Sequence, residues 1–200
     1  MTKEFVILEK KIAYAGFFRV EQYRLQHTLF NGGWSAEIGR ELFARGSCVA
    51  VLLYDPNTDQ VVLIEQFRAG AILQPDRAWL VEIVAGAIED GETAEQVAYR
   101  EAQEEAGCEI EQLLLINEFY TTPGGSSERI SLFCGKVDST QIGGVHGLVD
   151  EDEDILVSVV DFATAYDMVV SNQIESAIPI IAIQWLALNR QHLKQLWRTT

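Results

Sequence analysis

The residues of this sequence that could do chemistry are concentrated in residues 92–105, where glutamate recurs at short spacing. If residues 93–106 form a helix that advances about 100° per residue, with Ala94 at zero, the apolar side chains centre on about 0°. Glu101 then falls at about 340° and Glu105 at about 20°, within the apolar stripe, with Glu104 beside them at about 280°. The spacing therefore predicts two carboxylates that face the protein core one helical turn apart.

A glutamate-rich helix ordinarily turns its carboxylates to water, and this is the alternative to a functional site. The phase of Glu101 and Glu105 argues against it, because two such carboxylates raise one another's pKa strongly unless a cation lies between them. Arg100, the basic residue of this segment, points at about 240°, toward Glu104 rather than Glu105. A hard divalent metal ion with oxygen ligands is the predicted partner of the Glu101–Glu105 pair.

The elements that must position these carboxylates follow from capping signals and from alternation of apolar and polar residues. Thr93 and Gln96 form a capping box at the start of the helix, and Gly107 stands where a C-terminal cap belongs. Residues 4–44 alternate in short runs around an Asn31-Gly32-Gly33 turn, which predicts a meander of antiparallel strands. Further strands are predicted over residues 48–54, 60–67, 79–85, 111–120, 128–137 and 155–160, and further helices over residues 161–171 and 175–198.

These elements predict an α+β layer fold in which strands surround one internal helix and terminal helices close the structure. A chain of 200 residues suits one domain with room for an accessory element. We expect that element to be the meander of residues 1–45, a small N-terminal antiparallel β-sheet, and the main domain to span residues 46–200.

The charge of the chain excludes one class of partner. The sequence holds 15 Lys and Arg against 30 Asp and Glu, a formal net charge of −15. Such a surface repels the phosphate backbone, so we expect no nucleic-acid partner. It also repels a small anionic substrate unless local arginines or bound cations reverse the sign in the pocket.

The compartment is predicted from three observations. No apolar run reaches the roughly 18 residues needed to cross a bilayer. The N-terminus carries acidic residues in its apolar stretch and lacks a cleavage-site pattern, so it is not a secretory signal. Cys48, Cys108 and Cys134 are scattered without metal-ligand spacing, which indicates reduced, mostly buried thiols. We therefore expect a cytoplasmic protein with no membrane partner.

Glycine and charged residues around the helix follow a fixed pattern: Gly86, Glu92, Arg100, Glu101, Glu104, Glu105 and Gly107. This pattern resembles the Nudix box of the Nudix hydrolase family, and it is far more specific than a lone glycine motif. The resemblance implies a Nudix-type αβα sandwich with a mixed β-sheet over residues 46–200, with residues 86–92 as the loop before the helix. It also implies two or three Mg²⁺ ions per site, with Mn²⁺ as an alternative, held by the Ala85 carbonyl, Glu101 and Glu105. Arg100 and Glu104 would complete the catalytic machinery by orienting these ligands.

The similarity to Nudix hydrolases that act on ADP-ribose extends along nearly the whole chain and is weakest over residues 69–77. Pro123 follows Gly107 at the distance that marks ADP-ribose-type substrates in the family, and the acidic run of residues 150–154 resembles the family's terminal loop. The resemblance implies that Glu151 is the general base and Glu153 a further metal ligand. The residues implied in substrate binding are Phe17, Arg40, Glu41, Arg68, Glu82, Pro123 and Glu128.

The predicted reaction is hydrolysis of the pyrophosphate bond of ADP-ribose, and possibly of related ADP-sugars, to AMP and ribose 5-phosphate. Phe17 and Arg40 would sandwich the adenine by stacking and cation–π contact, and Arg68 would contact phosphate. In the family the N-terminal meander exchanges across a homodimer. The resemblance therefore implies that residues 1–45 mediate dimerisation and that the adenine site draws on both chains.

Several alternatives stay open at the level of sequence. A Nudix hydrolase for GDP-mannose or another sugar nucleotide would share the fold and the box. A non-catalytic sensor of ADP-ribose is disfavoured by the intact box, by the net charge and by the lack of a basic recognition helix. The acidic run alone is typical of a solvated loop, Pro123 could merely end a strand, and His146 is interpreted as structural.

Overall fold

The computed structural model describes residues 2–148, 150 and 152–197, and the chain divides into two compact units. Unit 1 comprises the described residues of Met1–Ser47 together with Tyr120–Arg129. Unit 2 comprises the described residues of Cys48–Phe119 and Ile130–Thr200. The turn that carries Pro123 therefore folds with the N-terminal segment.

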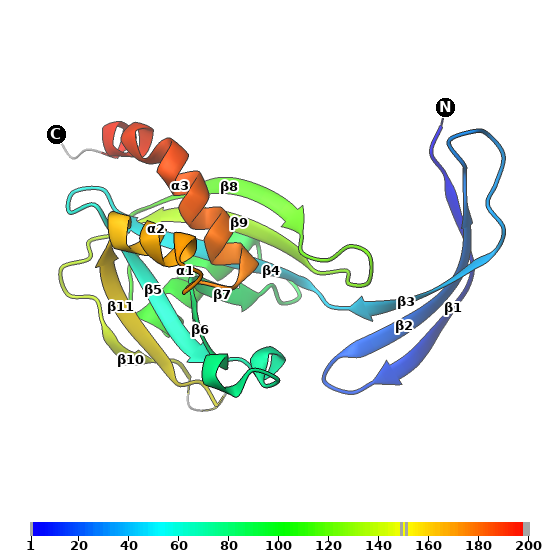
Figure 1. Cartoon of the computed structure of the whole chain (residues 1–200), viewed down its shortest axis with the longest axis horizontal. Helices are drawn as coiled ribbons and strands as arrows, with labels where there is room; N and C mark the ends of the chain where they lie inside the picture. The colour runs from blue at the N-terminus through cyan, green and yellow to red at the C-terminus, as the bar shows by residue number, and fades with distance from the viewer. Residues whose placement is uncertain (1, 149, 151, 198–200) are drawn as a thin grey trace. The chain divides into compact units, whose positions relative to one another are not determined.

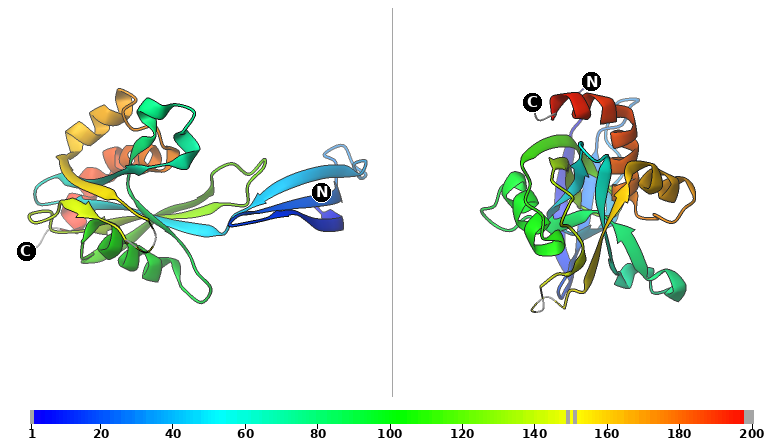
Figure 2. Two further views of the ribbon diagram at one scale, coloured as in Figure 1. Left: turned by 90° about the horizontal axis from the view of Figure 1, so that it is seen from below. Right: turned by 90° about the vertical axis from the view of Figure 1, so that its left-hand side faces the viewer.

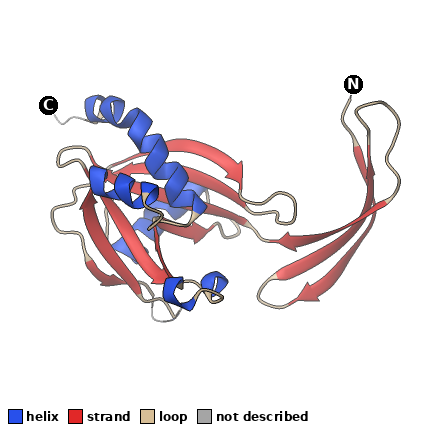
Figure 3. Cartoon of the chain, viewed as in Figure 1, coloured by secondary structure: helices blue, strands red, loops and turns tan. Residues whose placement is uncertain are grey.

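Unit 1 is built on an antiparallel sheet in the order β1-β2-β3 (Figure 3). Its strands are β1 (Phe5–Ala15), β2 (Arg19–His27) and β3 (Ile38–Ala44). Gly32 and Gly33 have φ of 87° and 78° in the connection between β2 and β3, a region that glycine enters without steric cost. The predicted antiparallel meander and its glycine turn are confirmed.

Unit 2 is built around a mixed sheet that the described residues show in the order β10-β11-β5-β4-β9-β8, with β6 beside β5 and β7 beside β4. Its strands are β4 (Ser47–Asp55), β5 (Gln60–Phe67), β6 (Trp79–Glu82), β7 (Val84–Ala87), β8 (Gln112–Tyr120), β9 (Arg129–Lys136), β10 (Gly144–His146) and β11 (Ile155–Asp161). Residues 69–77 hold two short 3₁₀ turns, η1 (Ala69–Ala71) and η2 (Pro75–Arg77).

One predicted strand was wrong. The sequence predicted a continuous strand over residues 79–85, but the chain changes partners at Ile83: β6 pairs with β5 and β7 pairs with β4. Ile83 is 2% exposed, so its side chain packs into the core at the point where the chain changes strand neighbours. A single-strand pattern in sequence does not reveal such a change, because both halves keep the same apolar character.

The helices of unit 2 lie on the two faces of this sheet (Figures 1 and 2). They are α1 (Ala94–Ala106), α2 (Phe162–Val170) and α3 (Ala177–Leu196). Alternation along β4 divides the core: Leu52 and Tyr54 pack with side chains of α2 and α3. Val51 and Leu53 pack with side chains of α1 on the opposite face. The predicted αβα sandwich is confirmed.

Local signals fix the ends of α1 as predicted. The Thr93 hydroxyl accepts from the Gln96 N–H at 3.2 Å, and the Gln96 side chain accepts from the Thr93 N–H at 2.8 Å. Gly107 ends the helix with φ of 61°. Loss of such an N-cap costs about 1 kcal/mol, so these ends help to hold the glutamates in phase.

The predicted cysteine environment is also observed, since all three cysteines are buried. Among the helices that the structure describes, none is both long and apolar enough to span a membrane.

Candidate active site

Helix α1 presents its carboxylates to the interior of unit 2. Glu105 is 3% exposed and lies among the buried residues of the helix. The side chain of Glu101, one turn earlier, is 12% exposed, while that of Glu104 is 28% exposed. The predicted phase of Glu101 and Glu105 is therefore confirmed.

Burial raises the pKa of both interior carboxyls. The pKa of Glu105 is raised to about 8, first by burial and then by the charges of Glu101 and Glu153, against a lowering hydrogen bond from the Ala85 N–H. The pKa of Glu101 is raised to about 7, again first by burial, while Arg100 opposes the shift. Burial rather than mutual repulsion is the larger cause, and a bound cation would remove the penalty on the charged forms.

Arg100 corrects one part of the sequence interpretation. Its guanidinium donates to Glu104 and to Glu101, both at 2.8 Å, and to Glu92 at 3.1 Å. The contact with Glu104 was predicted, but Glu101 was expected to lack a basic partner. Helical phase gives only the direction of the Cα–Cβ bond. The arginine side chain is long and flexible, so its guanidinium reaches both the Glu104 and the Glu101 carboxylates.

A glycine on β7 makes room for Glu101. A Cβ built on Gly86 would fall 1.7 Å from Glu101 Oε1, so no side chain fits at this position while the carboxylate stays in place. The neighbouring Ala85 N–H donates to Glu105 Oε2 at 2.9 Å. Gly86 was predicted to lie in a loop, but it lies in β7, where it pairs with Val49 of β4.

The end of β5 and the facing strand β6 contribute a charged pair. Arg68, just after β5, donates from Nε to Glu82 Oε2 at 2.7 Å, so the structure brings these two predicted substrate-binding residues together. Arg68 also lowers the pKa of Glu105 electrostatically, which shows that it lies within electrostatic reach of that carboxyl.

Sequence reasoning missed Gln66, two residues before Arg68. Gln66 is 7% exposed, and its Nε2 is buried without a hydrogen-bond partner among the described residues. A strand alternates its side chains, so Gln66 belongs to the same face of β5 as Ile64, which packs with α1, and Arg68 follows Gln66 by two residues in extended backbone. Strand alternation counted back from Arg68 was the signal that could have found it.

The acidic loop lies between β10 and β11. Within this loop, the charge of Glu153 raises the pKa of Glu101 and of Glu105, so Glu153 lies within electrostatic reach of both carboxyls. Glu153 Oε2 accepts from the Leu148 N–H at 3.1 Å. Glu151, the predicted general base, lies outside the described residues.

Unit 1 gathers other predicted substrate-binding residues around a hollow of about 420 Å³. Arg40, Glu41 and Pro123 line it, together with apolar side chains of β1 and β2. Phe17 does not line this hollow; it is 97% exposed and contacts Phe18 edge-on, with ring centroids 4.8 Å apart. The structure therefore groups Arg40 with Glu41 and Pro123, and it leaves Phe17 outside that group.

Glu128 is held within unit 1 by two partners. The Thr121 hydroxyl donates to Glu128 Oε2 at 2.9 Å, and Arg45 Nε lies 2.9 Å from Glu128 Oε1. Thr121 and Glu128 lie in the segment that carries Pro123, and Arg45 follows β3. The glutamate is thus positioned with its carboxylate already paired.

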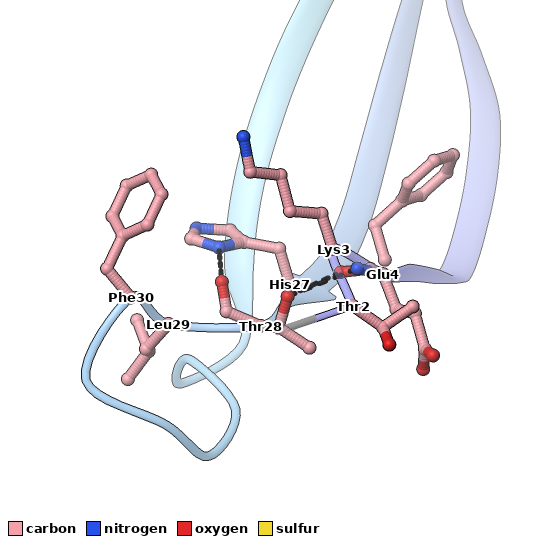
Figure 4. Close-up of a pocket in the computed structure, with 8 residues that line it drawn as sticks. Thr2, Lys3, Glu4, His27, Thr28, Leu29 and Phe30 are labelled. Atoms are coloured by element: carbon pink, nitrogen blue, oxygen red, sulfur yellow. Dashed lines mark hydrogen bonds between the residues drawn. The ribbon is translucent and has the colours of Figure 1, made fainter.

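A second hollow in unit 1, of about 370 Å³, lies between the start of β1 and the end of β2 (Figure 4). Its side chains include Lys3 and Phe30, with the Lys3 ammonium 5.8 Å from the centre of the Phe30 ring. None of the predicted site residues lines it.

The donor set on unit 2 fits a hard divalent metal. Among the described residues no group of three or more His, Cys, Asp or Glu is arranged to hold a metal ion. Mg²⁺ is usually bound through one or two carboxylates, retained water and substrate phosphates rather than a cage of side chains. The buried carboxylate of Glu105 and the partly buried carboxylate of Glu101, which lies against Gly86, match that requirement.

The αβα sandwich and the carboxylates that its internal helix turns inward define the class of domain. The family model described as "NUDIX domain" matches residues 44–174, and the chain belongs to the NUDIX family.

Relatives match over most of the chain. It is 47% identical over 191 residues to the ADP-ribose pyrophosphatase of Escherichia coli (strain K12), covering 96% of this chain and 91% of the relative. It is 44% identical over 195 residues to the ADP-ribose pyrophosphatase of Haemophilus influenzae, covering 96% and 90%. The GDP-mannose pyrophosphatase of Shigella flexneri is 29% identical over 190 residues, covering 94% and 98%. A crystal structure described as an ADP compounds hydrolase shares the fold, with a TM-score of 0.71 at 20% identity, covering 98% and 97%.

Proposed function

We propose that this chain is a divalent-metal-dependent hydrolase that cuts the pyrophosphate bond of ADP-ribose, releasing AMP and ribose 5-phosphate. The observation that carries the proposal is the pair of carboxylates, Glu101 and Glu105, which α1 turns into the interior of unit 2 one helical turn apart, and whose pKa values are raised first by burial. The choice of ADP-ribose as substrate is supported by two relatives of more than 40% identity, both of which are named ADP-ribose pyrophosphatase.

When bound, two or three Mg²⁺ ions, or Mn²⁺, would supply positive charge to the diphosphate and would lower the pKa of the attacking water. Glu101, Glu105, Glu153 and the Ala85 carbonyl would hold the metal. Arg100 orients Glu101 and Glu104 through its two hydrogen bonds of 2.8 Å.

The proton of the attacking water would pass to Glu151, the base that the family resemblance implies. Arg68 donates to Glu82 through Nε and its side chain is 42% exposed, so its remaining guanidinium N–H groups would donate to a phosphate oxygen. The buried amide nitrogen of Gln66 is a further donor on the same strand face.

Hydrolysis of GDP-mannose is the second candidate, because a GDP-mannose pyrophosphatase matches at 29% identity. The test is a panel of ADP-ribose, other ADP-sugars and GDP-mannose with Mg²⁺, followed by chromatography of the products. We expect AMP and ribose 5-phosphate from ADP-ribose, at a kcat/KM at least tenfold above that for GDP-mannose. A preference for GDP-mannose would reverse the assignment, and binding of ADP-ribose without turnover would favour the sensor alternative.

We further propose that unit 1 mediates a homodimer and brings the adenine-binding residues to the partner's catalytic unit. Support comes from the face of its sheet: Phe5, Ile7 and Ile12 on β1 are 69%, 49% and 59% exposed. Exposed apolar side chains at this density are typical of an interaction surface. Arg40→Ala is then expected to raise KM for ADP-ribose by about tenfold with little change in kcat, because adenine lies away from the reacting phosphorus.

Complementation tests whether each site draws on two chains. A doubly tagged heterodimer of one Arg40→Ala chain and one Glu105→Gln chain would keep one intact site. It is expected to recover about half the wild-type activity at low substrate concentration. Activity no higher than the mean of the two parent homodimers would show that each site lies within one chain, and an active monomer in sedimentation would contradict the dimer itself.

A further inference from the structure

The acidic loop is attached to the carboxyl end of α1 by a contact that the proposed chemistry does not use. His146 pairs with Ile155 across β10 and β11, so the chain leaves the sheet after His146 and rejoins it at Ile155, directly opposite. The Gly147 N–H donates to the Glu104 carbonyl at 3.3 Å. The last carbonyls of a helix have no partner within the helix, and here a distant segment supplies one.

The His146 side chain completes this attachment. A Cβ built on Gly107 would fall 2.6 Å from His146 Cε1, so the imidazole occupies the space that any side chain at residue 107 would need. On its other side, His146 Nε2 lies 3.1 Å from the Gly143 carbonyl oxygen. The ring thus lies between Gly107, which caps α1, and Gly143, which precedes β10.

Within the loop, the position of Glu153 depends on Gly147. The Leu148 N–H donates to Glu153 Oε2 at 3.1 Å, and the Glu153 N–H donates to the Leu148 carbonyl at 3.2 Å. Gly147 has φ of 104°, and a Cβ there would fall 2.7 Å from the Glu153 Cβ. A side chain at residue 147 would therefore push Glu153 away from its present place.

We propose that His146 and Gly147 are positioning residues that fix the acidic loop to helix α1. They hold Glu153 in one position relative to the carboxylates of Glu101 and Glu105. This inference rests on the proposed function. When Glu101 and Glu105 are ionised, they carry the same negative charge as Glu153, and like charges drive an untethered loop away from the helix. The attachment holds it there, and a misplacement of about 1 Å at a reacting centre can lower the rate by about 100-fold.

Gly144 provides a matched control for a substitution at Gly147. Both glycines belong to the same short segment and have φ near 100°, so alanine is strained at both. A Cβ at Gly144 meets no atom within 4 Å, whereas one at Gly147 meets Glu153. We expect Gly147→Ala to lower kcat by about 10- to 100-fold with KM within about threefold of wild type, and Gly144→Ala to stay within about threefold in both. Equal kinetics in the two variants would overturn the proposal.

His146→Ala carries the same test if Gly147→Ala does not fold. It removes the ring from Gly107 without adding backbone strain, and we expect the same loss in kcat at unchanged KM. Wild-type kcat in His146→Ala would overturn the role of this residue.

Hydrogen exchange gives a readout that does not depend on activity. In the full-length protein, His146→Ala is expected to speed exchange of the Leu148 and Glu153 amides and to leave the amides of Val97 and Ala98 in α1 unchanged. Unchanged exchange in the loop would contradict the attachment. If the wild-type protein does not hydrolyse ADP-ribose, the proposed function fails, but this measurement still decides whether His146 holds the loop.

Discussion

Glu105→Gln is expected to lower kcat for ADP-ribose hydrolysis by roughly 10³-fold, because a metal ion's stabilisation of transition-state charge amounts to several kcal/mol. The amide keeps the shape of the side chain and can still accept from the Ala85 N–H, which lies 2.9 Å from Glu105 Oε2. It loses the charge that would hold the cation. Steady-state kinetics at saturating Mg²⁺ measures the effect.

The same substitution should stabilise the metal-free protein. The pKa of Glu105 is raised to about 8 in the folded chain, first by burial, from an ordinary value of 4.5. As pH rises from about 4.5 to 8, the unfolded chain loses this proton while the folded chain keeps it, so the free energy of unfolding falls. Glu105→Gln removes that loss, and its Tm in chelator at pH 8 should exceed that of wild type.

Glu95→Gln is the matched control, since Glu95 is an exposed carboxylate of the same helix. We expect wild-type kcat and wild-type Tm for it. A Glu105→Gln variant that keeps wild-type activity would contradict the assignment of Glu105 as a metal ligand. A variant that is less stable than wild type in chelator would contradict the cost of burying the Glu105 charge.

Glu151→Gln is expected to lower kcat by roughly 10²- to 10⁴-fold while substrate and metal still bind, because glutamine cannot accept the proton of the attacking water. Glu153→Gln should fail differently. The amide can still accept from the Leu148 N–H and keep the loop closed. The lost charge weakens a metal site, so part of the activity should return at high Mg²⁺.

Asp154→Asn controls for charge in the same loop, because Asp154 is exposed. It should leave kcat and the Mg²⁺ dependence nearly unchanged. If the acidic run is merely a solvated loop, all three variants will resemble wild type. Wild-type kcat in Glu151→Gln at every Mg²⁺ concentration would remove Glu151 from the mechanism, and Glu104 would become the next candidate for the base.

The features that sequence predicted well are those set by neighbouring residues. The caps of α1 depend on Thr93, Gln96 and Gly107, all close in the chain, and helical phase follows from them. The inward orientation of Glu105 and Glu101 was therefore predictable. The strand predicted over residues 48–54 is likewise observed as β4, and its side chains pack on both faces of the sheet.

The features that sequence missed depend on distant partners. Nothing near Ile83 indicates that the chain changes from β5 to β4 as its neighbour. The three-residue strand β10 begins with glycine and gives no alternation pattern to read. The His146 ring packs against Gly107, which is far from it in the chain. From sequence, His146 was interpreted only as structural.

Hydrolysis of ADP-ribose is expected to need a divalent cation held by Glu101 and Glu105. The most direct test measures AMP release from ADP-ribose by the wild-type protein after exhaustive chelation, and again after Mg²⁺ is restored. We expect AMP release to fall to the uncatalysed level in chelator and to return fully with Mg²⁺. Undiminished AMP release in chelator would contradict the claim.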